Sequence, residues 1–175
     1  VHALVHMQML TFAAVNVDMA VGLGTSIEGI GFIGTIGYFL FGFGALPAGF
    51  VIDKIGARRV IALCAFGMAA ANLMLIFAPG APVAIAGLGL LGLSASLYPP
   101  AGLGLISRNV RQTGHAIALH GMIGNIGVAG GPLIAGLIAG GFGWRWAYAL
   151  PAAISALMAF IYFTTRFGDV GEDAR

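Results

Sequence analysis

Charged side chains are scarce in this chain. Its 175 residues include eight Lys or Arg and six Asp or Glu, so 8% are charged, whereas 59% are hydrophobic. A water-soluble domain carries about a quarter charged residues, so this chain has too few to cover a surface exposed to water. The net charge of +2 is also too small to indicate a nucleic-acid partner. We therefore expect the surrounding solvent to be the lipid bilayer.

Cysteine is almost absent as well. Cys64 is the only one and lies in an apolar run, so neither a disulfide nor a cysteine metal cluster can form within the chain. No metal-ligand cluster, nucleophile and base pair or phosphate-binding loop stands out elsewhere. We therefore expect no enzyme activity, no cofactor and no metal. The GxGxxG match at residues 87–92 lies inside an apolar run with no strand before it, which argues against dinucleotide binding.

Glycines and long apolar runs are abundant instead. A helix needs about 20 apolar residues to cross the hydrocarbon core, and six runs qualify. They are apolar on every face and about twice as long as a membrane β-strand, so helices are favoured. The 29 glycines suit helices that pack closely in lipid. The sequence thus predicts an all-α membrane protein with spans at residues 1–23, 30–52, 60–78, 83–106, 115–140 and 146–164.

The cations are distributed unevenly along this six-span path. All but Arg145 fall on one side, and such a bias marks the cytoplasmic face, so both termini are expected to be cytoplasmic. Short connections predict that consecutive helices are antiparallel neighbours. The aromatic residues around Arg145, at the start of the sixth span, predict an interfacial belt of Trp144, Trp146 and Tyr148. The cytoplasmic cations are Lys54, Arg58, Arg59, Arg108, Arg111, Arg166 and Arg175.

The densest group of charges lies between the second and third spans, in GFVIDKIGARR. Gly49 permits a close helix approach and Gly56 permits a tight turn. Asp53 lies near the start of the next segment, where a helix dipole favours negative charge. Arg58 and Arg59 can pair with Asp53 or with anionic headgroups. A plain positive-inside loop would explain the cations, but not the aspartate or the two glycines.

This spacing, between the second and third of six spans, resembles the loop signature of the major facilitator superfamily. In that family the loop is a cytoplasmic latch that engages the other half of the transporter in the outward-facing state. Many members have a basic residue directly after the second glycine, whereas this chain has Ala57. The departure weakens the interactions expected around Asp53, and Arg108 is a candidate substitute.

The fifth span contains GNIGVAGGPLIAG, which is similar to the glycine and proline motif of the fifth helix in the same superfamily, often called the antiporter motif. Gly127 and Gly131 form one GxxxG pair, and Gly136 and Gly140 form another, a pattern that allows close helix contact. Pro132 loosens the helix because it lacks a backbone N–H. Ordinary packing glycines with a tolerated proline are the alternative interpretation.

The resemblance covers the whole chain, but only as half of a transporter. The family fold has 12 helices in two six-helix halves, with substrate bound near the midplane between them. The resemblance implies that residues 1–164 are the N-terminal six-helix bundle and that residues 165–175 begin the cytoplasmic linker. YPPAGLGLISRNV and GHAIALHGMIGNIG are similar to a bacterial branch with drug-efflux and fosmidomycin-resistance-like members. This implies a bacterial inner membrane, and Val1 in place of Met favours a clipped N-terminus.

Polar side chains within the expected spans are functional candidates by default. His6 can exchange a proton near neutral pH and shares a helix face with His2. Tyr98 precedes a Pro-Pro pair that is expected to break the fourth span where its backbone lines a cavity. A histidine bonded to a neighbouring backbone is the alternative. The candidates for a substrate or proton path are His6, Gln8, Asn16, Asp18, Tyr98, His120 and Asn125.

Two functions are open from the sequence. The first is a secondary active transporter of a small solute, coupled to protons and working by alternating access with a missing C-terminal half. The second is a stand-alone six-helix protein that forms a homodimeric transporter or acts as an interaction partner. The few charged groups in the spans favour a neutral or amphipathic solute. The fifth-span motif leans toward antiport, and uptake and efflux both stay open.

Overall fold

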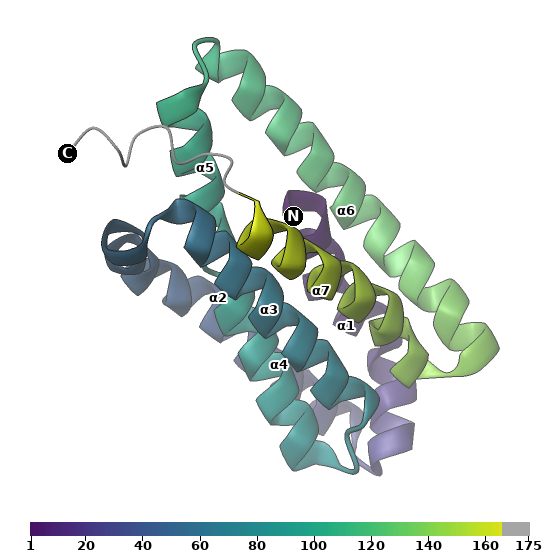
Figure 1. Ribbon diagram of the computed structural model, residues 1–175. Helices are drawn as coiled ribbons and strands as arrows, with labels where there is room; N and C mark the ends of the chain where they lie inside the picture. The colour runs from purple at the N-terminus through teal and green to yellow at the C-terminus, as the bar shows by residue number, and fades with distance from the viewer. Residues whose placement is uncertain (166–175) are drawn as a thin grey trace.

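The computed structural model describes residues 1–165, and within that range the chain forms helices and no strand (Figure 1). Six helical segments of this part of the chain are long and apolar enough to cross a membrane, as predicted. Their ends differ from the expected ones by at most three residues. The helices are α1 (His2–Leu23), α2 (Ile27–Ile55), α3 (Ala57–Ile76), α4 (Ala81–Ala95), α5 (Tyr98–Asn109), α6 (Thr113–Phe142), the 3-10 helix η1 (Trp144–Tyr148) and α7 (Ala149–Thr164).

The fourth span is broken into α4 and α5, as its proline pair predicts. Pro99 and Pro100 have no backbone N–H, so in a continuous helix two carbonyls one turn earlier would lose their donors. At the start of a new helix those donors are not needed, and α5 begins one residue before Pro99. In the gap, the Ser96 hydroxyl donates a hydrogen bond of 2.6 Å to the carbonyl of Leu93.

A single residue separates α2 from α3. This residue, Gly56, has φ 82° and ψ 149°, a backbone conformation that residues with side chains rarely adopt. The tight turn expected in the charged loop is therefore present, and it sets the end of α2 directly beside the start of α3. The expected linker lies outside the described residues from position 166 onward.

Helix pairing agrees only in part with the predicted order of neighbours, since α1 contacts α2 and α5 contacts α6, but less extensively than other pairs. The most extensive contacts join α1 to α6, α3 to α7 and α2 to α4, and α3 also packs on α4. Within residues 1–165, α6 and α7 are not a packed pair, although they are consecutive spans. In Figure 1 α6 runs along one side of the bundle, and α7 lies over α1. The short connections fix the helix order, but other contacts decide which helices pack together.

The aromatic residues around η1 also correct the prediction of an interfacial belt. Trp144 and Tyr148 are buried, and only Trp146 is exposed. The Arg145 guanidinium lies 4.3 Å from the centre of the Trp144 ring and donates a hydrogen bond of 2.8 Å to the carbonyl of Ala78. These residues therefore join η1 to the end of the third span.

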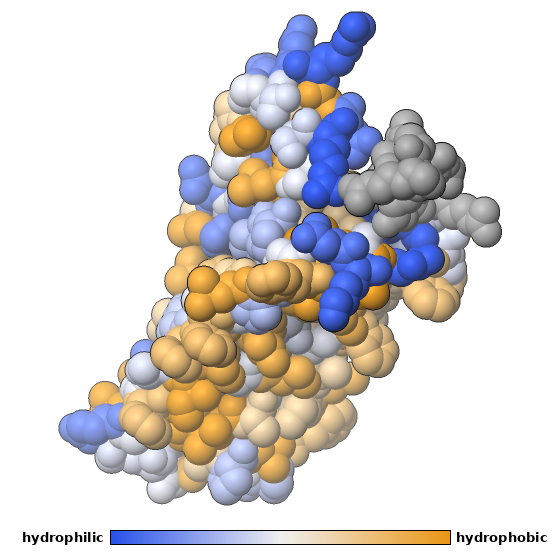
Figure 2. Space-filling model, turned by 90° about the vertical axis from the view of Figure 1, so that its left-hand side faces the viewer, coloured by the Kyte–Doolittle hydropathy of each residue, from blue (hydrophilic) through white to orange (hydrophobic). Residues whose placement is uncertain are grey.

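The outer surface of the bundle is largely apolar. Phe32, Phe50 and Phe163 are 68%, 74% and 83% exposed, which in water would be a large unpaired hydrophobic area. Figure 2 shows strongly hydrophilic residues gathered mainly toward one end of the molecule, with a mostly hydrophobic surface below them. This distribution matches a bundle that lies across a bilayer with its charged loops at one membrane face.

Candidate functional site

The contact between α1 and α6 depends on glycines of the predicted fifth-span motif. A Cβ atom at Gly127 would overlap the backbone of Ala3, and one at Gly131 would lie 2.7 Å from Cα of Met7. The two helices can approach this closely only because these positions lack side chains. At Gly136, in contrast, an added Cβ would meet no described atom within 4 Å. The α6 helix continues without interruption through Pro132.

Three histidines and a tyrosine meet beside this contact, and we refer to His2, His6, Tyr98 and His120 as the His–Tyr cluster. The rings of His2 and His120 stack with their centres 3.9 Å apart, and Tyr98 stacks 5.6 Å from His2 and 5.8 Å from His120. His6 Nε2 lies 3.0 Å from His2 Nε2. The structure thus brings together three of the predicted path residues from α1, α5 and α6.

The carbonyl contact of His2 indicates which of its ring nitrogens carries the proton. His2 Nδ1 lies 2.8 Å from the carbonyl oxygen of His120, and a carbonyl only accepts, so Nδ1 is the donor. A neutral His2 then accepts at Nε2, and His6 donates to it. If His2 gains a second proton at Nε2, His2 becomes the donor at that atom, and the hydrogen bond persists only if His6 changes to the tautomer whose Nε2 accepts. The His2–His6 contact is therefore sensitive to protonation.

His2 is the residue that sequence reasoning underrated. Its ring occupies space that a side chain on α6 would fill, because a Cβ at Gly124 would lie 2.5 Å from His2 Cε1. Gly124 follows His120 by four residues and therefore shares its helix face. His2 and His6 are four residues apart in α1, as are His120 and Gly124 in α6, so the sequence places each pair on one helix face. It did not reveal that the faces meet.

Gln8, another predicted path residue, lies in a separate buried network. Its Nε2 donates to the Ser155 hydroxyl at 2.7 Å, and its Oε1 accepts from Asn72 Nδ2 at 2.6 Å. Asn72 also donates to the carbonyl of Met68 at 2.6 Å. Gln8, Asn72 and Ser155 are each fully buried. We therefore assign Gln8 to packing between α1, α3 and α7 rather than to a path that a solute could reach.

The other predicted path residues lie apart from both groups. Asn16 is half-buried and Asp18 is exposed, both on α1, and Asn125 is exposed on α6. None of the three side chains hydrogen-bonds to another residue within positions 1–165. They add polar groups to the outer surfaces of α1 and α6, two of the helices that carry the His–Tyr cluster.

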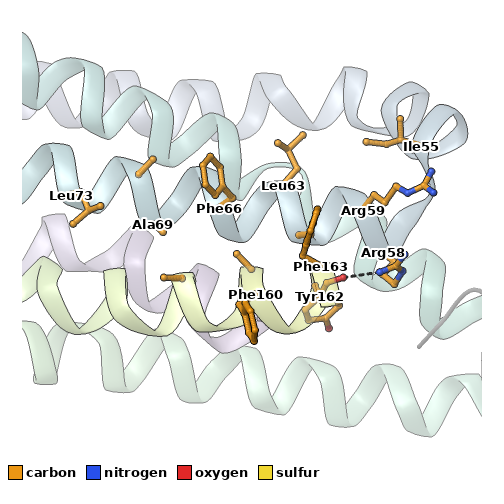
Figure 3. Close-up of a pocket in the computed structure, with 14 residues that line it drawn as sticks. Ile55, Arg58, Arg59, Leu63, Phe66, Ala69, Leu73, Phe160, Tyr162 and Phe163 are labelled. Atoms are coloured by element: carbon orange, nitrogen blue, oxygen red, sulfur yellow. Dashed lines mark hydrogen bonds between the residues drawn. The ribbon is translucent and has the colours of Figure 1, made fainter. Parts of the chain in front are cut away.

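The charged loop is attached to the end of the last span rather than to its own aspartate. Arg58 Nη1 donates to the carbonyl of Tyr162 at 2.9 Å (Figure 3) and to that of Thr165 at 2.8 Å. Asp53 is exposed and forms no ion pair with any residue of the described range. Gly49 is also exposed, and an added Cβ there would meet nothing within 4 Å. The close approach expected at Gly49 is therefore not made to another helix of this bundle.

The histidines do not form an evident metal centre. Among residues 1–165, no group of three or more His, Cys, Asp or Glu side chains is arranged to hold a metal ion. The chemistry that the His–Tyr cluster offers is proton exchange and hydrogen bonding with a solute, together with flat aromatic faces for stacking.

The fold and these polar groups define a membrane protein with six spans and ionisable groups within those spans. The chain belongs to the Major Facilitator Superfamily, whose sequence profile matches residues 1–174. The resemblance of the loop and of the fifth span to this superfamily is therefore confirmed at the level of the family.

Curated relatives include the multidrug resistance protein B homologs of two Mycobacterium tuberculosis strains, CDC 1551 / Oshkosh and ATCC 25618 / H37Rv. Each is 28% identical over 127 residues, which cover 70% of this chain and 24% of the relative. The chain thus spans about a quarter of the length of the curated relatives that it matches.

Solved structures with the same fold include two crystal structures of a mutant peptide transporter POT, in complex with alafosfalin and with sulfate. Each superposes with a TM-score of 0.82 at 17% identity, over 97% of this chain and 37% or 36% of the transporter. At this low identity the likeness concerns the fold alone. The six-span bundle corresponds to little more than a third of those chains.

Proposed function

We propose that this chain is the N-terminal half of a secondary active transporter that moves a small solute by alternating access. The observation that carries the proposal is the family match over residues 1–174, together with a bundle of six spans where the family fold has 12. In this proposal residues 1–164 form one half, residues 165–175 begin the cytoplasmic linker, and a second half completes the solute site. The protein lies in the bacterial inner membrane with both termini in the cytoplasm.

We further propose that solute and protons pass along the polar surface of α1 and α6. Polar groups inside a membrane face a water-filled cavity or the bundle interior, and the His–Tyr cluster, Asn16, Asp18 and Asn125 all lie on or beside these helices. Few charges line this surface, which favours a neutral or amphipathic solute. The name of the curated relatives, multidrug resistance protein B homolog, supports efflux of such solutes. Proton-driven antiport fits the protonation-sensitive contact between His2 and His6.

The charged loop acts in this proposal as the cytoplasmic latch. Gly49 and Asp53 are exposed, and a Cβ added at Gly49 would meet no described atom within 4 Å, so both are available to a partner half. Arg58 instead holds the loop against the end of α7 through two carbonyls. In this proposal Asp53 engages the other half of the transporter. Arg58 holds the loop that carries Asp53 in position.

A second copy of the chain is the other candidate for the missing half. It is favoured by the open face of α6, where Gly136 and Gly140 have no described neighbour within 4 Å of an added Cβ. A homodimer would place the two α6 faces on either side of one cavity. A two-half polypeptide and a homodimer differ in mass and in stoichiometry, which light scattering of the purified natural-length protein distinguishes.

The proposed orientation predicts which loops react with a reagent outside the cell. In a Cys64→Ala background, Glu28→Cys should be labelled by a membrane-impermeant maleimide on intact cells. Lys54→Cys should be labelled only after the membrane is permeabilised. Both positions are exposed, so accessibility of the side chain does not limit either reaction. Labelling of Lys54→Cys on intact cells, with Glu28→Cys unreactive, would contradict a cytoplasmic latch.

The latch role predicts that Asp53→Asn impairs transport without impairing membrane insertion. A hydrogen bond that involves a charged group is worth about 1.5–3 kcal/mol, so transport should fall by about 10- to 140-fold. The measurement is accumulation of an amphipathic dye by energised inside-out vesicles that contain the natural-length protein. If wild-type vesicles accumulate none of the dyes in a broad panel, this result argues against drug efflux. Equal transport by wild type and Asp53→Asn argues against the latch.

A further inference from the structure

A groove lies on the outside of the bundle between α3 and α7, and we refer to it as the α3–α7 groove. It encloses about 890 Å³ and is lined by side chains of both helices from Arg58 to Leu73 and from Ala156 to Phe163 (Figure 3). The proposed latch and solute path give it no role. The groove is separate from the His–Tyr cluster, which is built from α1, α5 and α6.

The groove is apolar along its length and cationic at one end. Phe66, Phe160 and Leu73 line it with exposed fractions of 65%, 64% and 50%. Its charged lining residues are Arg58 and Arg59, and Figure 3 shows both at the end opposite Leu73. A ligand that fills this groove therefore needs a long apolar part and an anionic group at one end.

The two arginines contribute in different ways. The Arg58 guanidinium is half-buried and is fixed by the carbonyls of Tyr162 and Thr165, so its positive charge has a defined place. Arg59 is exposed beside it, with no hydrogen bond to the described residues. An Arg side chain offers five N–H donors in a planar fork that matches phosphate oxygens. Arg59 is therefore placed to bind a phosphate directly, next to a second positive charge.

The length of the groove matches the dimensions of a lipid leaflet. Arg59 and Leu73 are fourteen residues apart on α3, a rise of about 21 Å at 1.5 Å per residue. Half of a bilayer of about 40–45 Å, headgroup regions included, is about 20–22 Å. An acyl chain whose phosphate lies at Arg59 would therefore run along the groove to about the middle of the bilayer, past Phe66 and Phe160.

The surroundings of the groove favour lipid over a solute cavity. The His–Tyr cluster and the exposed Asp18 and Asn125 lie on α1, α5 and α6, whereas the groove beyond its arginines is lined by aliphatic and aromatic residues. Charged or polar groups inside a membrane face water or protein, so a face without them is suited to lipid. Cationic groups at the membrane surface attract anionic headgroups.

We propose that the α3–α7 groove binds one molecule of an anionic phospholipid, with an acyl chain against Phe66 and Phe160 and the phosphate at Arg59. The site rests on the apolar groove and the charge at its end, and does not depend on the solute or on proton coupling. Because Arg58 also joins the loop to α7, the bound lipid would lie directly against the segment that carries Asp53.

The test is native mass spectrometry of the natural-length protein, released from detergent with phosphatidylglycerol or with phosphatidylcholine of the same acyl chains. A complex with one phosphatidylglycerol should be observed at a lower lipid concentration than a complex with one phosphatidylcholine. Because a cation at the membrane surface is worth about 1 kcal/mol, Arg59→Gln should weaken phosphatidylglycerol binding about fivefold. Arg111→Gln removes an exposed cation from another loop and should leave binding unchanged.

A groove variant and a competing anion test whether the acyl chain and the headgroup both contribute. Ala156→Phe adds a ring from an exposed position that lines the groove, and should displace the lipid without changing the far-UV circular dichroism. Excess inorganic phosphate should not displace it, because phosphate lacks the acyl chain. The proposal is overturned by equal retention of the two lipids, by equal losses in Arg59→Gln and Arg111→Gln, by displacement with phosphate, or by a protein dimer that occupies the groove instead of lipid.

Discussion

Gly127→Ala should separate α1 from α6 and strongly destabilise the bundle. The added Cβ would overlap the backbone of Ala3, and backbone atoms cannot move aside as the end of a flexible side chain can. Overpacking a tight core typically costs about 1–3 kcal/mol and occasionally more. We expect a value at or above the upper end of this range, because one whole helix must shift. The measurement is the thermal unfolding midpoint of the natural-length protein in detergent.

Gly136→Ala is the matched control on the same helix. An added Cβ there meets no described atom within 4 Å, and alanine is a better helix former than glycine by about 1 kcal/mol in peptides. This variant should therefore unfold at the wild-type temperature or slightly above it. Equal unfolding temperatures for Gly127→Ala and wild type would show that the two helices are not packed in this way. A large loss in Gly136→Ala would instead indicate that this face is covered by the other half.

The spans were predictable because lipid imposes a simple requirement. Each span must satisfy its own backbone hydrogen bonds, so apolar length alone identified six helices. Pro99 and Pro100 fixed the break in the fourth span for the same reason, since neither can donate to the preceding turn. The pairing of α1 with α6 and of α3 with α7 was not predictable, because a GxxxG pair marks a close contact without naming its partner. Gly136 belongs to the same motif as Gly127 and yet meets no helix of this bundle.

The candidate site was predictable only residue by residue. His6, Tyr98 and His120 were identified as ionisable or polar groups inside spans, and the spacing placed His2 on the face of His6, but the sequence did not indicate that this face would meet His120. Gln8 looked the same as these residues in the sequence, because a polar side chain in an apolar run gives the same signal whether it faces a cavity or another helix. Its bonds to Asn72 and Ser155 come from helices far apart in the chain, and only the fold reveals them.

His2→Gln should uncouple transport from the proton gradient. In the structure, His2 donates to the carbonyl of His120 and accepts from His6, and a second proton on its ring would remove the acceptor. Glutamine retains a donor and an acceptor but does not titrate near neutral pH. The side chain at position 2 then offers His6 an acceptor at every pH. Proton-driven accumulation should fall at least tenfold, the equivalent of about 1.4 kcal/mol, while exchange of solute at equilibrium, which needs no net proton movement, should continue.

The measurement compares driven accumulation and equilibrium exchange of the same dye in vesicles between about pH 5 and 8, the range in which histidine charge changes. The wild-type rate of driven transport should depend on pH across this range, and the His2→Gln rate should depend on pH less steeply, because His6 and His120 remain in the cluster. His115→Gln is the control, because His115 is an exposed histidine of α6 outside the cluster, and its pH profile should match wild type. If His2→Gln keeps the wild-type profile, or if exchange fails together with driven transport, His2 stabilises the α1–α6 contact and does not carry the coupled proton.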